Sequence, residues 1–121
     1  MVRASDGQVA DGDVADGAGG ALLVRADRRT YRVAFSDIRY VQGMKDYAML
    51  HLSGRRLMTA ATLGGLAARL PAGFLRTGKS YVVNLAHVVA YDPHTVYLDG
   101  EDLPLSPLHR DAFAAAFERT R

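Results

Sequence analysis

Short apolar runs separated by turn-forming residues restrict the fold of this chain more than any other feature. Each run contains β-branched or aromatic residues and ends at Gly, Asp, Ser or a polar cluster, a pattern typical of strands joined by hairpins. Asp99-Gly100, for example, is a strong hairpin dipeptide. The expected strands lie at residues 21–25, 30–34, 40–41, 47–52, 57–59, 87–92 and 95–100. The sequence therefore predicts a mostly β fold made of short antiparallel sheets.

A short helix is expected in the middle of the chain, between Thr62 and Pro71. Thr62 is suited to the N-cap position and Pro71 to the stop, although two glycines lie between them. The apolar residues recur at helical spacing and are Leu63, Leu66, Ala67 and Leu70. Because the polar face is nearly bare, this helix is expected to be a packing element, and its one charge, Arg69, is expected to be solvated.

A second helix is expected at the C-terminal end, over residues 108–119. Ser106 and Pro107 provide a suitable pair for the N-cap and first helical positions. The apolar side of the helix is formed by Leu108, Ala112, Phe113, Ala116 and Phe117. This helix is expected to pack on the sheet and to expose His109 and Arg110 in its first turn.

The charge of the chain is divided unevenly along the sequence. Of its 15 Lys and Arg and 13 Asp and Glu, residues 1–20 hold Arg3 and four Asp, a net charge of −3, so residues 21–121 carry 14 minus 9, or +5. The acidic leader repeats Asp-Gly and is expected to be flexible, which places one domain at residues 21–121. The leader is either a linker from an upstream regulatory domain or a disordered tail. The basic body is compatible with a polyanionic partner.

Composition and spacing argue against several functional classes. No apolar run approaches the roughly 18 residues of a membrane span, and no secretory signal follows Arg3, so a cytoplasmic location is expected. The chain has no Cys, which excludes disulfides and thiolate metal sites. Its 4 His lack ligand spacing, and RTGKS lacks the glycine frame of a P-loop. We therefore expect no enzyme activity, no metal and no cofactor.

Residues 74–84, FLRTGKSYVVN, combine a basic loop with an apolar run and are the first candidate for a functional segment. Arg76 and Lys79 flank Gly78, which lets the backbone approach a ligand or adopt a positive φ angle. The apolar run at residues 81–83 would anchor this loop in a core. Taken alone, the segment is better explained as an ordinary loop followed by an edge strand or helical turn.

Other basic residues also recur at strand ends and in loops, namely Lys45, Arg55, Arg56 and Arg110. Loops that share one edge of a sheet domain can present such residues together to a polyanion. Solubilising surface charge is the alternative interpretation, and it suffices for Arg28 and Arg29.

Four blocks in a fixed order resemble the LytTR family, the DNA-binding domains of bacterial response regulators. The blocks are SDIRYVQGMKDYAMLHL, TLGGLAARL, FLRTGKSYVVNL and DLPLS, and the resemblance covers about residues 21–119. It implies a mostly β fold with a short central helix and a C-terminal helix. It also implies that loops enter successive major grooves of double-stranded DNA and contact the minor groove between them. The family often binds paired repeats as a dimer.

Matched position by position, the resemblance implies three DNA-contacting loops. The first holds Lys45, Asp46 and Tyr47, and the second holds Gly78, Lys79 and Ser80. The third follows Ser106 and offers His109 or Arg110. Phosphates are expected to be contacted by Arg56, Arg76 and Ser80, with Arg55 beside them. Bases are expected to be read by Lys79 together with Lys45 and His109 or Arg110.

Three positions depart from the usual pattern of the family. Gly78 stands where His is usual, which removes one phosphate contact. Asp46 would accept a hydrogen bond from a base donor such as cytosine N4, or it is structural and Lys45 makes the contact instead. Pro107-Leu108 takes the place of the usual basic residue, so His109 or Arg110 is the expected substitute.

The same residues also fit a second class of protein. A small β interaction module would bind a sensor or another protein through this fold, and its basic loops would only be solvated. Salt dependence separates the two classes, because a DNA binder with about five phosphate contacts has a log-log slope of about −4 to −5.

Overall fold

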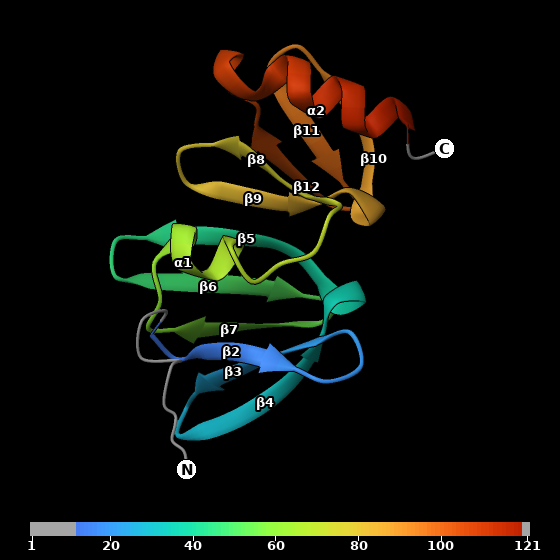
Figure 1. Cartoon of the computed structure of the whole chain (residues 1–121). Helices are drawn as coiled ribbons and strands as arrows, with labels where there is room; N and C mark the ends of the chain where they lie inside the picture. The colour runs from blue at the N-terminus through green and yellow to red at the C-terminus, as the bar shows by residue number, and fades with distance from the viewer. Residues whose placement is uncertain (1–11, 120–121) are drawn as a thin grey trace.

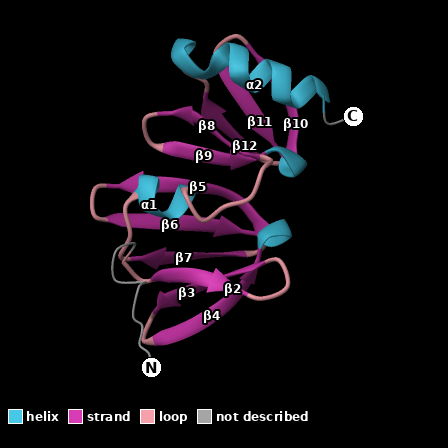
Figure 2. Cartoon of the chain, in the orientation of Figure 1, coloured by secondary structure: helices cyan, strands magenta, loops and turns pink. Residues whose placement is uncertain are grey.

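Three antiparallel sheets follow one another along the molecule, with one helix against the middle sheet and one at the C-terminal end (Figure 1). The computed structural model describes residues 12–119. Strands make up most of the regular structure in this range (Figure 2). The prediction of a mostly β fold with two small helices is therefore confirmed.

The N-terminal sheet has the strand order β2-β3-β4. Its strands are β2 (Val14–Gly17), β3 (Ala21–Ala26) and β4 (Arg29–Ala34). The predicted hairpin of β3 and β4 is closed by Asp27 and Arg28, whose φ angles of 53° and 64° fit a type I′ turn. The described residues form two hydrophobic cores. The first core begins on this sheet, where Leu22 and Val24 are fully buried, and the second lies between the middle sheet, the C-terminal sheet and the C-terminal helix.

Strand β2 corrects the expected start of the domain at Ala21. It pairs with β3, and Val14 is buried in the first core, so residues 14–17 are not a flexible leader. Asp16 Oδ1 lies 3.1 Å from Arg69 Nη1, so Arg69 is in an ion pair rather than solvated as expected. Composition concealed this strand, because Ala, Asp and Gly are poor strand formers. The rest of the expected leader, residues 1–11, lies outside the described residues.

The middle sheet has the strand order β7-β6-β5-β9-β8. Its strands are β5 (Ile38–Met44), β6 (Tyr47–Leu52), β7 (Arg55–Thr59), β8 (Phe74–Gly78) and β9 (Tyr81–Asn84). Strand β5 continues to Met44, because residues 42–44 pair with residues 47–49. The interruption expected at residues 42–46 is therefore only a turn at Lys45-Asp46.

Helix α1 (Leu63–Ala67) covers one face of the middle sheet. The predicted N-cap is confirmed, since Thr62 Oγ1 accepts a hydrogen bond from Gly65 N at 3.0 Å. Leu63 and Leu66 are buried in the first core. Strand β5 approaches closely at Gly43, where an added Cβ atom would lie 2.8 Å from Leu63 Cβ.

The C-terminal sheet contains β10 (Val88–Asp92), β11 (Thr95–Leu98) and β12 (Glu101–Pro104), and helix α2 (Pro107–Arg119) follows. Phe113 and Ala116 are buried in the second core as predicted, and Phe117 packs against it. Leu108 is 85% exposed, so its expected place on the apolar side is wrong. At 3.6 residues per turn it lies about 140° around the helix from Phe113. Ala112 is also exposed, whereas His109 and Arg110 are half-buried rather than exposed.

Polar contacts join the middle and C-terminal sheets. Arg39 Nη1 lies 2.8 Å from Glu101 Oε1, and the Tyr40 hydroxyl donates to Glu101 Oε2. Burial raises the pKa of Glu101, but the hydrogen bonds from Tyr40 and Arg39 outweigh it, and the pKa lies below its usual value. The His51 ring stacks on Tyr40 with centroids 4.0 Å apart, and burial lowers the pKa of His51.

Asn84, which ends the apolar run of residues 81–83, has a structural role. Its Nδ2 donates to Ile38 O at 2.9 Å, and its Oδ1 accepts from Ala86 N at 3.1 Å. These bonds fix the end of β9 against the start of β5, so the hairpin that holds Lys79 is attached to both cores.

Candidate nucleic-acid interface

Two hairpin turns, which join β5 to β6 and β8 to β9, lie side by side at the same end of the strands of the middle sheet (Figure 1). We call residues 44–47 tip 1 and residues 78–81 tip 2. In tip 1, Met44 pairs with Tyr47 around the turn Lys45-Asp46, and Lys45 has a φ angle of 61°. In tip 2, Gly78 pairs with Tyr81 around Lys79-Ser80. The two tips are adjacent because Gly43 N donates to Ser80 O at 2.8 Å.

The two tips have the same polar design. Each turn begins with an exposed Lys, Lys45 or Lys79, followed by an exposed polar residue, Asp46 or Ser80. Arg76 supports tip 2, since its Nη1 donates to Lys79 O at 3.1 Å. The sequence-predicted residues of the first two loops are therefore brought together, with their charged groups in water.

Gly78 was expected to let the backbone approach a ligand or adopt a positive φ angle, and its φ angle is not positive. It is buried, and its φ angle lies outside the left-handed region that favours glycine. A Cβ atom added to Gly78 would meet nothing within 4 Å. The ladder of β8 and β9 is irregular between Arg76 and Gly78, and the intervening Thr77 side chain is fully buried. Glycine is therefore not required here by backbone conformation or by close packing.

The third loop, residues 105–110, is attached beside tip 2. Ser106 N donates to Thr77 O at 2.7 Å, which ties the start of α2 to the end of β8. His109 Nδ1 lies 2.8 Å from Ser106 Oγ, which leaves Nε2 for other partners. Arg110 Nε donates to Pro93 O at 2.6 Å, so this guanidinium is held against the β10–β11 turn.

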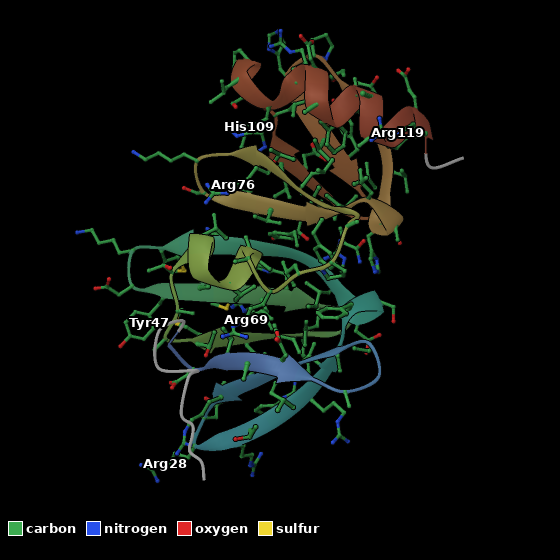
Figure 3. All side chains as sticks on the ribbon, in the orientation of Figure 1. Arg28, Tyr47, Arg69, Arg76, His109 and Arg119 are labelled. Atoms are coloured by element: carbon green, nitrogen blue, oxygen red, sulfur yellow. The ribbon has the colours of Figure 1, made fainter. Side chains whose placement is uncertain are left out.

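The three loops form a row along one side of the molecule. In Figure 3, Tyr47 of tip 1 lies at the left, and Arg76 next to tip 2 and His109 of the third loop follow above it, nearer the middle of the view. His94, which sequence reasoning did not select, is exposed in the turn next to the third loop, where its carbonyl accepts from Leu105 N at 2.9 Å. Only the chain topology reveals this neighbour, since it lies outside every motif.

Arg55 and Arg56 do not join this row. They begin β7 at the end of the sheet where Leu52 pairs with Ile38, whereas tip 1 closes the opposite end of β5 and β6. Leu52, opposite Arg55, lies five residues along β6 from Tyr47, or about 16 Å, and His51, opposite Arg56, lies four residues from it, or about 13 Å. The Arg55 guanidinium instead lies 5.0 Å from the centre of the Tyr31 ring.

Among residues 12–119, no group of three or more His, Asp or Glu side chains is placed to hold a metal ion. In the same range, no helix is long and apolar enough to cross a membrane.

A β domain that presents Lys45 and Lys79 in adjacent hairpin turns, with His109 and Arg110 at a helix start beside them, has features of a nucleic-acid-binding domain. The family of LytTr DNA-binding domains matches residues 28–118. The chain thus belongs to the LytTR family of DNA-binding domains, and the resemblance inferred from four sequence blocks is confirmed.

A solved structure has the same fold. It is the LytTr DNA-binding domain of a methyl-accepting/DNA response regulator from Bacillus cereus, with a TM-score of 0.71 and 19% sequence identity. The match covers 82% of this chain and 97% of that chain. Comparison with curated proteins gave no match.

Proposed function

We propose that this domain binds double-stranded DNA sequence-specifically, as the output domain of a bacterial transcription regulator. The three adjoining loops carry the proposal, because the two turns expose Lys45 and Lys79 and the third loop holds the half-buried His109. Membership of a family of DNA-binding domains supports it.

The spacing of the tips favours contacts with neighbouring grooves. Strands in a sheet lie about 4.8 Å apart, so the centres of tips 1 and 2 are about 10 Å apart. Successive turns of a major groove on one face of DNA are about 34 Å apart. Tips 1 and 2 are therefore too close to occupy successive major grooves. We propose instead that tip 1 enters a major groove and that tip 2 and the adjoining third loop continue from it along the same face of the duplex, across the backbone and the minor groove.

The side chains divide into two roles in this arrangement. Arg76 and Ser80 contact phosphates, which supplies affinity without sequence information. Lys45 and His109 or Arg110 contact base edges, and Lys79 contacts the groove between them. Because Arg110 Nε is held by Pro93 O, His109 Nε2 is the better placed group of the third loop.

Assembly and regulation belong to the same proposal. The family resemblance favours a homodimer on paired repeats, and an acidic leader joined to an upstream regulatory domain would supply the signal. A cytoplasmic location follows if the partner is the bacterial chromosome.

The test begins with selection of bound duplexes from a random pool, followed by titration at several salt concentrations. A log-log slope of about −4 to −5 is expected for about five phosphate contacts. Lys79→Ala should weaken binding to the selected duplex by about 1–3 kcal/mol. Arg32→Ala removes an exposed cation from β4, away from the row, and should leave affinity nearly unchanged. Failure to bind any duplex would contradict the proposal.

The alternative is a β module that binds a protein partner. The exposed Leu108 and Val89 are the observations in its favour, since they are 85% and 65% exposed. In that case duplex titration gives no salt-dependent signal, and Lys79→Ala has no effect on the true ligand.

A further inference from the structure

Two exposed apolar side chains flank the turn of tip 1. Met44 is 42% exposed and Tyr47 is 51% exposed. They are the last cross-strand pair of the β5–β6 hairpin, so both side chains stand on the same face of the sheet. The pair contributes to the hairpin, but about half of each side chain stays open to water beside a candidate binding turn, where a ligand can cover it.

Tip 2 provides an internal comparison. It has the same two-residue turn, the same leading Lys and the same following Tyr as tip 1. Gly78 stands opposite Tyr81, however, where tip 1 has Met44 opposite Tyr47. Tyr81 is half-buried and packs against the second core. Each turn therefore begins with an exposed Lys, but tip 1 has Asp46 where tip 2 has Ser80, and Lys45 has a positive φ angle whereas Lys79 does not. Of the two tips, tip 1 has the exposed apolar pair.

The chemistry of DNA restricts what such a surface can contact. The phosphate backbone offers charged oxygens, whereas the major groove exposes one apolar group, the C5-methyl of thymine. Met suits this contact, because its unbranched side chain adapts to irregular surfaces. An exposed Lys45 next to the pair supplies attraction for the polyanion.

We infer that Met44 and Tyr47 form a thymine-methyl contact that makes tip 1 specific for an A·T pair. The inference rests on the proposed function and names the chemistry that tip 1 reads. An A·T pair presents the thymine methyl and the adenine N6 amino group in the same groove. Asp46 is exposed in the turn between Met44 and Tyr47, and its carboxylate is an acceptor for that amino group, so one base pair engages both parts of the tip.

The experiment replaces each thymine of the selected duplex by deoxyuridine, which removes the methyl group and keeps base pairing. At one or two positions, affinity should fall about three- to fivefold, the worth of one buried methyl group. Met44→Ala should lose a similar factor on the thymine duplex and no longer distinguish thymine from uracil. Met44→Leu, which keeps an apolar side chain, should retain the distinction. Val89→Ala truncates another exposed apolar residue, on β10, and should behave as the parent chain.

The outcomes separate this inference from the function on which it rests. Salt-dependent binding with no effect of uracil at any position overturns the thymine contact alone. If uracil still weakens binding of the Met44→Ala variant, another residue makes the methyl contact, and the inference about Met44 and Tyr47 is also overturned. Replacement of cytosine by 5-methylcytosine tests whether tip 1 contacts a methyl group on cytosine instead. A gain in affinity with 5-methylcytosine, without any loss when thymine is replaced by uracil, overturns thymine as the ligand. No binding to any duplex overturns both proposals.

Discussion

The amide of Gly43 donates to the carbonyl of Ser80 across 2.8 Å, and this bond extends the pairing of β5 and β9 to the edge of the sheet. It aligns the turn that contains Lys45 with the turn that contains Lys79. The relative position of the two cations therefore depends on the register of β5, a strand whose other end is fixed by Asn84.

Gly43→Ala should destabilise the domain by about 1–3 kcal/mol, the usual cost of overpacking a core. The added methyl group would lie 2.8 Å from Leu63 Cβ, so either α1 or β5 must shift. Urea unfolding of the variant measures this loss as a lower midpoint at unchanged slope.

Gly78→Ala is the matched control for Gly43→Ala. An added Cβ atom there meets nothing within 4 Å, and the backbone is not in the left-handed region. This variant should be as stable as the parent chain or more stable by about 0.4–1 kcal/mol, because Ala restricts the unfolded chain. Equal destabilisation by both substitutions would contradict the close packing of β5 on α1.

Local signals in the sequence were enough to predict the hairpins and the central helix. Thr62 is a helix cap whatever lies around it, and Ser53-Gly54 and Asp99-Gly100 form turns by their own backbone preferences. Strand β2 escaped prediction because its stability comes from burial of Val14 and pairing with β3, not from its composition.

The residues that lie together in the candidate interface were harder to predict from the sequence than the fold. Lys45 and Arg56 both follow strand patterns, but the number of residues in β6 decides that they lie at opposite ends of the sheet. Arg69 looked solvated because its partner Asp16 belongs to a strand with no sequence signal. Leu108 and Ala112 share one side of α2, but Phe113 and Ala116 set the buried direction, and the sequence alone does not show which apolar residues face the sheet.

Acid should weaken the junction between the middle and C-terminal sheets in two steps. The lowered pKa of His51 means that the unfolded chain gains a proton first, below about pH 6.5. The lowered pKa of Glu101 adds a second loss of stability below about pH 4.3, as its carboxylate is protonated. Stability therefore falls as pH falls in both windows.

Glu101→Gln should remove the second loss and keep the first. Thermal unfolding followed between pH 7 and pH 3 provides the measurement, and Asp102→Asn, an exposed neighbour on β12, serves as the control. A variant that loses stability at low pH as steeply as the parent chain would show that the Glu101 carboxylate is not responsible.

Thr77→Val should stabilise the domain by about 1 kcal/mol or leave its stability unchanged. The Thr77 side chain is fully buried, and its hydroxyl has no hydrogen-bond partner among the described residues. Removing an unsatisfied buried polar group avoids its desolvation cost. The bond from Ser106 N to Thr77 O uses the backbone and is retained, so DNA affinity should not change. Marked destabilisation in urea would mean that the hydroxyl is satisfied in solution.

Comparing Arg56→Ala with Lys45→Ala should show whether DNA affinity depends on where a cation lies in the fold or only on the net charge. Arg56→Ala removes a cation about 13 Å from tip 1 along the strand, whereas Lys45→Ala removes one in the turn itself. Lys45→Ala should weaken binding to the selected duplex by about 1–3 kcal/mol if it reads a base, or lower the salt slope by about 1 if it contacts a phosphate. Arg56→Ala should change affinity less than twofold at moderate salt, because separated charges are screened beyond a Debye length of about 10 Å. Equal losses for the two variants across salt concentrations would extend the DNA-binding surface to the far end of the middle sheet and would contradict an interface confined to the row of three loops.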